Sequence, residues 1–166
     1  MRTQIGIGAL LLVAGLGCNQ NHMGLAADSQ LAAVAPAGGS IGVMVTTKVT
    51  LQFTHAMRQG MEQYIAVHEG PVTGPLVAGA WSWSSDRRTL RLAPARPLAP
   101  LTLYTIHVGG GMQDTQNHMM GLDRNGMGMG GQWLSSAMMG SNTGMMGAGW
   151  QHANGSYGMV FTFTTE

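Results

Sequence analysis

Methionine and histidine are concentrated around residues 117–131, in the stretch NHMMGLDRNGMGMGG. Methionine normally fills gaps in hydrophobic cores, but here it is interspersed with glycine, which builds no core. A thioether is a soft, neutral donor that suits Cu(I) or Ag(I), whereas zinc prefers thiolates or several imidazoles and calcium prefers carboxylates. The residues of this region that can contact a soft metal ion are Met112, His118, Met119, Met120, Met127, Met129 and Trp133.

The same composition continues toward the C-terminus. Ten of the fifteen methionines lie between residues 112 and 159, and residues 125–165 contain no Lys, Arg, Asp or Glu. Three Met-Met-Gly units, at 119–121, 138–140 and 145–147, form a crude internal repeat. Two or three sulfurs with one imidazole would make a low-coordinate site for Cu(I) or Ag(I). The predicted metal ligands are His118, Met119, Met120, Met127, Met129, Met138, Met139, Met145, Met146 and His152.

Two other interpretations of this region stay open. A segment rich in Met and Gly can be a low-complexity spacer or an adaptable surface that binds a protein partner in the cell envelope. It can also be ordered by packing on the rest of the protein, with its methionines forming a satellite core. The histidines outside the region are expected not to bind metal; they are His22, His55, His68 and His107.

The sequence contains no arrangement typical of catalysis. It has no Ser-His-Asp set, paired carboxylates, phosphate-binding loop or zinc cluster at a recognisable spacing. We therefore predict that the protein is not an enzyme and takes no small-molecule substrate. Charged residues make up only 9 % of the chain and the formal net charge is +1, which gives no indication of a nucleic-acid partner.

The N-terminal stretch MRTQIGIGALLLVAGLGC indicates export. Its apolar run, residues 5–16, is too short to span a hydrocarbon layer of about 30 Å and fits the core of a signal peptide. Cys18 is the only cysteine and cannot form an internal disulfide. Its position after AGLG resembles a bacterial lipobox, which implies lipidation of Cys18 and a membrane contact through the lipid alone. Plain secretion, with cleavage near residues 24–27, stays open, and either route leads to the cell envelope or the cell surface.

The rest of the chain has the pattern of an antiparallel β-sandwich. In KVTLQFT, apolar residues alternate with polar ones, as in a strand that is buried on one side. Similar segments separated by turn residues predict about seven strands, six of which we place at residues 48–54, 64–70, 77–84, 88–94, 102–108 and 158–165. The expected core is Val49, Leu51, Phe53, Ile65, Val67, Trp81 or Trp83, Leu90, Leu92, Tyr104, Ile106, Phe161 and Phe163.

The order of several short motifs resembles the bacterial Ig-like domain of S-layer and other surface proteins. The stretches are PAGGSIGVMVTTKVTLQFTHAM, then SSDRRTLRLAPARPLAPLTLYTIHVGGGMQD, and the closing FTFTT. The resemblance implies an all-β, Ig-like fold that supplies non-catalytic spacers and binding scaffolds. It also implies a structural role for Met57 and a bond from the Tyr104 hydroxyl to the backbone. Leu101 stands where that family usually has glycine, so its turn is expected to differ.

In that family, a D-x-x-x-N turn is followed by the last strand within about ten residues. Residues 121–157 are therefore an insertion of about 35 residues between the last two strands. Loops of that length are usually functional or disordered. The resulting division is a signal peptide (1–18), a tether (19–33) and an Ig-like domain (34–166) that carries this insertion.

A looser resemblance connects the chain with CopC-type periplasmic copper carriers, which are also small Ig-like sandwiches with a Met-rich loop. Asp114 and His118 occupy the region of that family's Asp and His, but their spacing is wider, and no His follows Cys18 at the expected start of the mature chain. We therefore do not expect this chain to have a Cu(II) site like that of the CopC-type carriers. Our hypothesis is an exported, lipid-anchored Ig-like protein that binds Cu(I) or Ag(I) for buffering or transfer. The alternative is a structural or adhesion module at the cell surface whose loop binds a protein partner.

Overall fold

The computed structural model describes residues 29–140 and 143–166. The predicted signal peptide, the predicted lipidation site Cys18 and most of the predicted tether lie outside the described residues. Within the described part of the chain, no helix is long and apolar enough to cross a membrane.

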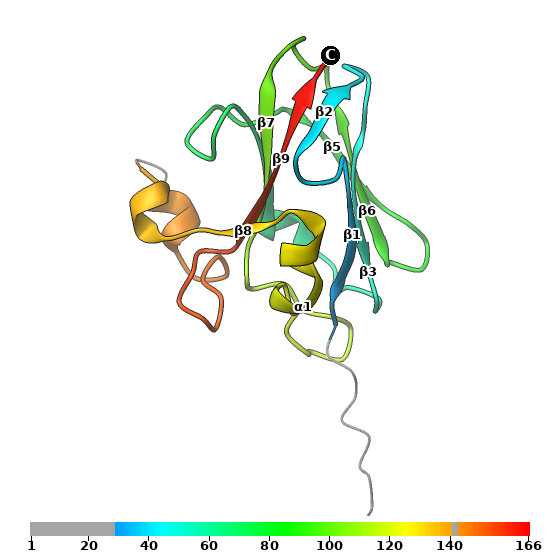
Figure 1. The fold of residues 1–166 in the computed structure, drawn as a ribbon. Coiled ribbons are helices and arrows are strands. Elements are labelled where there is room, and N and C mark those ends of the chain that lie inside the picture. The colour runs from blue at the N-terminus through cyan, green and yellow to red at the C-terminus, as the bar shows by residue number, and fades with distance from the viewer. Residues whose placement is uncertain (1–28, 141–142) are drawn as a thin grey trace, which may run out of the picture.

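Two β-sheets pack face to face, as the alternation of apolar residues predicts (Figure 1). The first sheet has the order β1-β3-β6-β5, with β1 (Leu31–Ala35), β3 (Val49–Phe53), β6 (Thr89–Pro94) and β5 (Gly79–Trp83). The second has the order β2-β9-β7-β4, with β2 (Ser40–Val43), β9 (Met159–Thr165), β7 (Leu103–Val108) and β4 (Ile65–Glu69), which follows η1 (Met61–Tyr64). The short strand β8 (Gln132–Trp133) pairs with β9 in this second sheet.

The prediction of an all-β sandwich is confirmed, and the described residues form nine strands. The three strands that the pattern did not predict are β1, β2 and β8. β1 begins at Leu31, inside the segment predicted as a tether. It was missed because LAAVA contains no polar residue that could alternate with the apolar ones. β2 contains Gly42 at φ 66° and pairs with β9 in parallel through an irregular register. Neither β1 nor β2 therefore shows the alternating pattern of a strand in the sequence.

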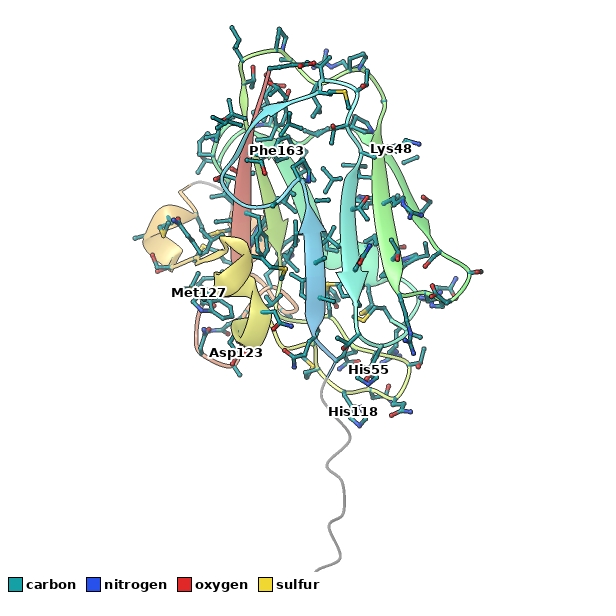
Figure 2. All side chains as sticks on the ribbon, turned by 45° about the vertical axis from the view of Figure 1, so that its right-hand side comes forward. Lys48, His55, His118, Asp123, Met127 and Phe163 are labelled. Carbon is teal, nitrogen blue, oxygen red and sulfur yellow. The ribbon has the colours of Figure 1, made fainter. Side chains whose placement is uncertain are left out.

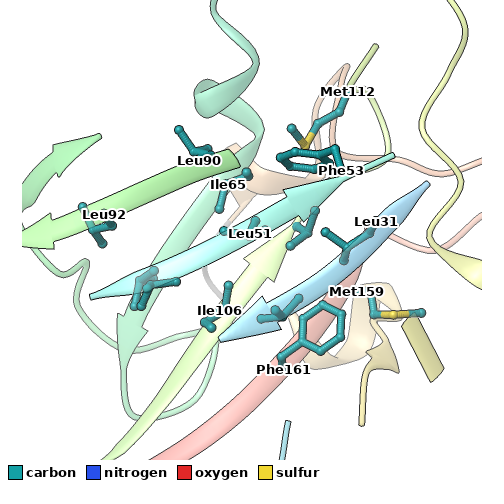
Figure 3. Close-up of a cluster of buried hydrophobic side chains, with 14 of the residues drawn as sticks. Leu31, Leu51, Phe53, Ile65, Leu90, Leu92, Ile106, Met112, Met159 and Phe161 are labelled. Carbon is teal, nitrogen blue, oxygen red and sulfur yellow. The ribbon is translucent and has the colours of Figure 1, made fainter. Parts of the chain in front are cut away.

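The main core fills the space between the two sheets (Figure 3). Every predicted core residue belongs to it, with Trp81 and Trp83 packed at its edge. Met57 is completely buried, which confirms its structural role. Burial of one such side chain stabilises the fold by about 1.5–3 kcal/mol. The other methionines of this core are Met61, Met112, Met120 and Met159.

The turn before β7 has the Tyr104 hydrogen bond that the resemblance implied, whereas the difference expected at Leu101 does not appear in its backbone. The Tyr104 hydroxyl accepts a hydrogen bond from the backbone N–H of Ala99 at 2.7 Å, as expected. Leu101 adopts the left-handed conformation, with φ 50°, and its side chain is exposed. The turn therefore keeps a backbone geometry that favours glycine even though leucine occupies the position.

The described residues of the insertion pack on the framework, which confirms the satellite-core interpretation. It contains short helical turns and β8; the turns are α1 (Asp123–Gly126), η2 (Met127–Met129), η3 (Ser136–Met138) and η4 (Thr143–Met146). A second hydrophobic cluster forms where the insertion covers the outer face of the second sheet. Its buried members are Val72, Leu134, Met139 and Val160, and its partly buried members are Met145, Met146 and Tyr157.

Backbone hydrogen bonds fasten the end of the insertion to the loop after β7. Gly110 donates to the carbonyl of Trp150 at 3.1 Å, and Gly111 donates to that of Gly149 at 2.7 Å. Gly149 has φ 92°, and a Cβ atom there would lie only 2.0 Å from the ring of Tyr64. Glycine is thus required where the insertion crosses this loop, and residues 149–150 are held against it.

Candidate metal-binding pocket

A surface pocket of about 320 Å³ lies where the turn after β7 meets the insertion. His118, Met119 and Met120 line it from the turn, and Asp123 and His152 line it from the insertion. Figure 2 shows His118 at the lower end of the molecule, with Asp123 on α1 above it. Four of the predicted ligands, two imidazoles and two thioethers, therefore surround one space although His152 is distant from the others in sequence.

Asp114 holds His118 in place. One carboxylate oxygen, Oδ1, accepts the backbone N–H groups of Gln116 at 2.8 Å and His118 at 2.9 Å. The other, Oδ2, lies 3.2 Å from His118 Nδ1. A neutral imidazole that donates through Nδ1 presents the lone pair of Nε2, as in the carboxylate–histidine arrangement that orients metal ligands. The His118 side chain is 37 % exposed, so solvent reaches part of the ring.

The Asp114 carboxyl stays ionised although it is almost completely buried. Burial raises its pKa, but the hydrogen bonds from the His118 and Gln116 backbones outweigh this effect, together with the hydrogen bond of the His118 side chain and, when that ring is protonated, its charge. The net result is a pKa below the usual value. The turn is thus built around a buried carboxylate that requires the nearby imidazole N–H as a partner.

The two methionines of the pocket differ in environment. Met119 is 50 % exposed, and its sulfur accepts a long hydrogen bond from Gln113 Nε2 at 3.3 Å. Met120 is 1 % exposed and belongs to the main core, where its backbone N–H bonds to the carbonyl of Met112. Met119 is therefore the accessible sulfur, whereas Met120 forms the floor of the pocket.

His152 enters the pocket from the far end of the insertion. Its ring packs against Trp133, with centroids 4.8 Å apart. Its Nδ1 atom is buried and has no hydrogen-bond partner among the described residues. A buried polar atom without a partner costs about 1–3 kcal/mol and points to a missing ligand or solvent contact.

The other predicted ligands lie outside this pocket. Met127 and Met138 are exposed, and Met129 packs against the edge of the main core. The second hydrophobic cluster contains Met139, Met145 and Met146. The sequence could not separate these groups, because all share the same Met-Gly composition and differ only in which side of the insertion faces the sheet.

No carboxylate, thiolate or imidazole cluster of the kind that holds zinc or calcium occurs in residues 29–140 and 143–166. No three His, Cys, Asp or Glu side chains there are close enough together to bind a metal ion. The pocket also contains thioether sulfur, a donor that suits soft ions.

Two histidines that the sequence did not indicate as ligands are fully buried. His68 on β4 and His107 on β7 have no exposed surface. Burial lowers the pKa of His107 to about 4; a hydrogen bond to Tyr157 opposes this effect, and the charge of His68 adds to it. Burial also lowers the pKa of His68, against the effect of a hydrogen bond to Gly74. Strand alternation places both on the outer face of the second sheet. Residues of the insertion lie against His107 there, and the loop after β4 lies against His68.

Several solved structures are similar to this chain at low identity. Surface layer protein SbsC, domains 1–6, matches at 13 % identity and TM-score 0.42 over 57 % of this chain, which spans only 12 % of that protein's length. PcoC, a methionine rich copper resistance protein from Escherichia coli, matches at 14 % identity and TM-score 0.46, covering 84 % of this chain and 100 % of its own. CopC from Methylosinus trichosporium OB3b gives 14 % and 0.46, covering 83 % and 93 %. Similarity at this level carries no inference about ligands.

Comparison with curated proteins gave no match. A family model described as the bacterial Ig-like domain matches residues 27–125, more than half of the chain. The match covers the strands from β1 to β7 and the Asp114–His118 turn, and it ends where the insertion begins to turn back over the sheet. The chain belongs to the family of bacterial Ig-like domains.

Proposed function

We propose that this chain is an exported Ig-like protein that binds Cu(I) or Ag(I) in the pocket between its framework and its insertion. The observation that carries the proposal is the His118 imidazole, which Asp114 orients beside the accessible sulfur of Met119. His152 lines the same pocket with a buried, unpartnered nitrogen. Imidazole and thioether together form a neutral donor set that suits a soft monovalent ion.

The exposure of the site supports transfer or buffering of the ion. Met119 is half exposed and His118 more than a third exposed, so an incoming protein can approach both ligands while the ion is still bound. Direct transfer of an ion between two proteins requires that ligands of both proteins reach the ion at the same time. The signal-peptide pattern and the lipobox-like Cys18 support a location in the cell envelope. Bacterial Ig-like domains are typically non-catalytic, which agrees with a carrier rather than an enzyme.

The proposal is tested by titrating the purified protein with Cu(I) against a competing chelator under reducing, oxygen-free conditions. We expect saturable binding that weakens at least 10-fold in Met119→Leu, because leucine keeps the volume of the side chain but removes the sulfur. The matched control is Met127→Leu. Met127 is 57 % exposed, close to the 50 % of Met119, but it does not line the pocket.

Equal loss of affinity in both variants would contradict a specific pocket and indicate general sulfur scavenging. No binding in the wild-type protein would reject the function. His152→Gln tests whether the insertion contributes a ligand, because it removes the imidazole by which the insertion lines the pocket.

A second candidate is a cell-surface module whose insertion binds a protein partner. Met127 and Met138 favour it, because both are large apolar side chains exposed on the insertion. Flexible methionines are common on adaptable binding surfaces. This function predicts a partner whose capture from envelope extracts is abolished by Met127→Glu and Met138→Glu and is unaffected by Cu(I) or by Met119→Leu.

A further inference from the structure

His68 and His107 lie side by side on the outer face of the second sheet. In the antiparallel pairing of β4 with β7, Ala66 faces His107 and His68 faces Thr105. The two histidines are therefore diagonal neighbours whose side chains leave the same face of the sheet. Their ring centroids are 6.4 Å apart, and their planes are inclined by 38°.

Each ring uses one nitrogen to bind a backbone carbonyl. His68 Nδ1 lies 3.0 Å from the carbonyl oxygen of Gly74, and His107 Nε2 lies 2.7 Å from that of Tyr157. A carbonyl only accepts hydrogen bonds, so both of these nitrogens carry the proton of a neutral ring. The remaining nitrogens, His68 Nε2 and His107 Nδ1, carry lone pairs; both are buried and have no hydrogen-bond partner among the described residues.

The insertion covers the His107 side of this pair, and the loop after β4 lies against His68. The Trp150 ring lies against His107, with centroids 4.6 Å apart, and the Tyr157 carbonyl holds the His107 ring from the same side. The pair is therefore fixed between a sheet and a covering layer, with both neutral rings oriented by the backbone. The two fixed imidazoles therefore present buried lone pairs that no hydrogen-bond donor of the described residues fills, and such a lone pair can bind a metal ion.

We propose that His68 Nε2 and His107 Nδ1 bind one monovalent soft ion, Cu(I) or Ag(I), in a two-coordinate site beneath the insertion. Two imidazoles that share an ion in line would have their centroids about 6.3 Å apart, given metal–nitrogen distances of roughly 2.0–2.1 Å. The observed 6.4 Å fits this arrangement. A structural zinc ion would need four ligands, and the described chain offers no cluster of three His, Cys, Asp or Glu side chains.

This site is independent of the proposed pocket and differs from it chemically. The pocket combines sulfur with nitrogen near solvent, whereas the buried pair supplies nitrogen only. Because the pair has no exposed surface, an ion enters only when the insertion opens, so the buried site loads more slowly than the pocket.

The experiment uses a protein whose pocket is disabled by His118→Asn, Met119→Leu and His152→Gln. Titration of this variant with Cu(I) against a competing chelator is expected to retain one equivalent. X-ray absorption of the bound copper should then show nitrogen ligands and no sulfur. Retention of no ion, or sulfur in the coordination shell, overturns the proposal, and either result leaves the test of the pocket itself unaffected.

Two substitutions remove the free nitrogens and keep the structural hydrogen bonds. In His68→Asn the amide nitrogen replaces Nδ1 as the donor to Gly74, and in His107→Gln it replaces Nε2 as the donor to Tyr157. In the pocket-disabled protein, each should reduce Cu(I) affinity at least 100-fold. Unchanged affinity in either variant rejects the site.

A measurement without substitution covers the case in which these variants do not fold. Nitrogen NMR of the wild-type protein at Ag(I) saturation should shift the signals of His68 Nε2 and His107 Nδ1. The signals of His68 Nδ1 and His107 Nε2 should keep the character of protonated nitrogens. Unchanged signals for the first two atoms would show that the pair is structural only.

Discussion

The outer faces of the two sheets differ in what lies over them. On the first sheet, the outward positions of β3, β5 and β6 include Gln52, Ser82 and Arg91, all exposed to solvent. On the second sheet, the corresponding positions of β4, β7 and β9 include His68, His107 and Val160, all buried. Residues of the insertion lie against His107 and Val160, and the loop after β4 lies against His68. The strands alternate in the same way in both sheets, so the difference comes from these covering segments.

The comparison shows how an insertion changes the chemistry of a framework without changing its strands. An outward histidine on a bare sheet is a solvated surface group. The same residue under a layer that contains Trp150 and Tyr157, as His107 is, has a strongly lowered pKa because it is buried.

The largest expected effect separates two adjacent methionines of the insertion. Met139 is completely buried in the second cluster, whereas Met138 is 48 % exposed. We expect Met139→Ala to lower the free energy of unfolding by roughly 2–5 kcal/mol through lost burial and a cavity. Met138→Ala should change it by less than about 0.5 kcal/mol. Chemical denaturation of both variants checks this, and similar small effects would contradict a second core.

The next effect is acid destabilisation of the metal-free protein. An unfolded histidine titrates near pH 6.5, whereas the pKa of His107 in the folded protein is about 4. Between these values the unfolded chain binds a proton that the folded chain does not, so stability falls as the pH decreases from about 6.5 to 4. The loss from His107 amounts to about 3 kcal/mol, and His68 acts in the same direction. Denaturation across this pH range measures the loss, and His107→Gln should reduce it. A stability that is independent of pH in the range would contradict the burial of both rings.

A smaller effect concerns the exposed imidazole of the pocket. Asp114→Asn keeps an oxygen for the backbone N–H groups of Gln116 and His118 but replaces the acceptor at His118 Nδ1 by an amide donor. The ring proton then moves to Nε2, which removes the lone pair that faces the pocket. We expect Cu(I) affinity to fall about 10–100-fold, as for other residues that orient metal ligands. Binding at the buried pair should not change, because neither His68 nor His107 contacts Asp114 through a hydrogen bond in the described structure. An unchanged affinity of the pocket would show that His118 is not a ligand.

The smallest effect comes from the uncovered face. Gln52→His places an imidazole at an outward, exposed position of β3, directly opposite Thr89 on β6. Its pKa measured by NMR should stay near 6.5, and the unfolding free energy should change by about 0.5 kcal/mol or less. A strongly lowered pKa at this position would mean that strand placement, rather than the insertion, controls the histidines of the other sheet.

The sequence predicted the sandwich well because its core strands obey a period of two. Leu51, Leu90 and Phe161 could be assigned to the interior from alternation alone, and all are buried. β1 and β2 were missed because LAAVA and SIGV lack that alternation, and their strand character depends on pairing with distant partners. Local pattern therefore identified the strands that are buried on one side, and tertiary contacts determined the rest.

The candidate sites were less predictable than the fold. The cluster of His118 with Met119 could be read from adjacent residues, but the approach of His152 depends on the path of the whole insertion. The alternation in YIAVHEG and TLYTIHV places His68 and His107 on the outer face, where histidine is normally solvated. Only the position of Trp150 and Tyr157 against His107, and of Gly74 against His68, shows that they are interior.

The parallel pairing of β2 with β9 has a mechanical consequence. The beginning of β1 and the C-terminal end of β9 lie at opposite ends of the sandwich (Figure 1). A pulling force between Ser29 and Glu166 therefore acts along the strands. It loads the hydrogen bonds of β1 with β3 and of β2 with β9 together, in shear, rather than one after another. A domain that is pulled in this direction resists extension, whether or not its insertion binds a ligand.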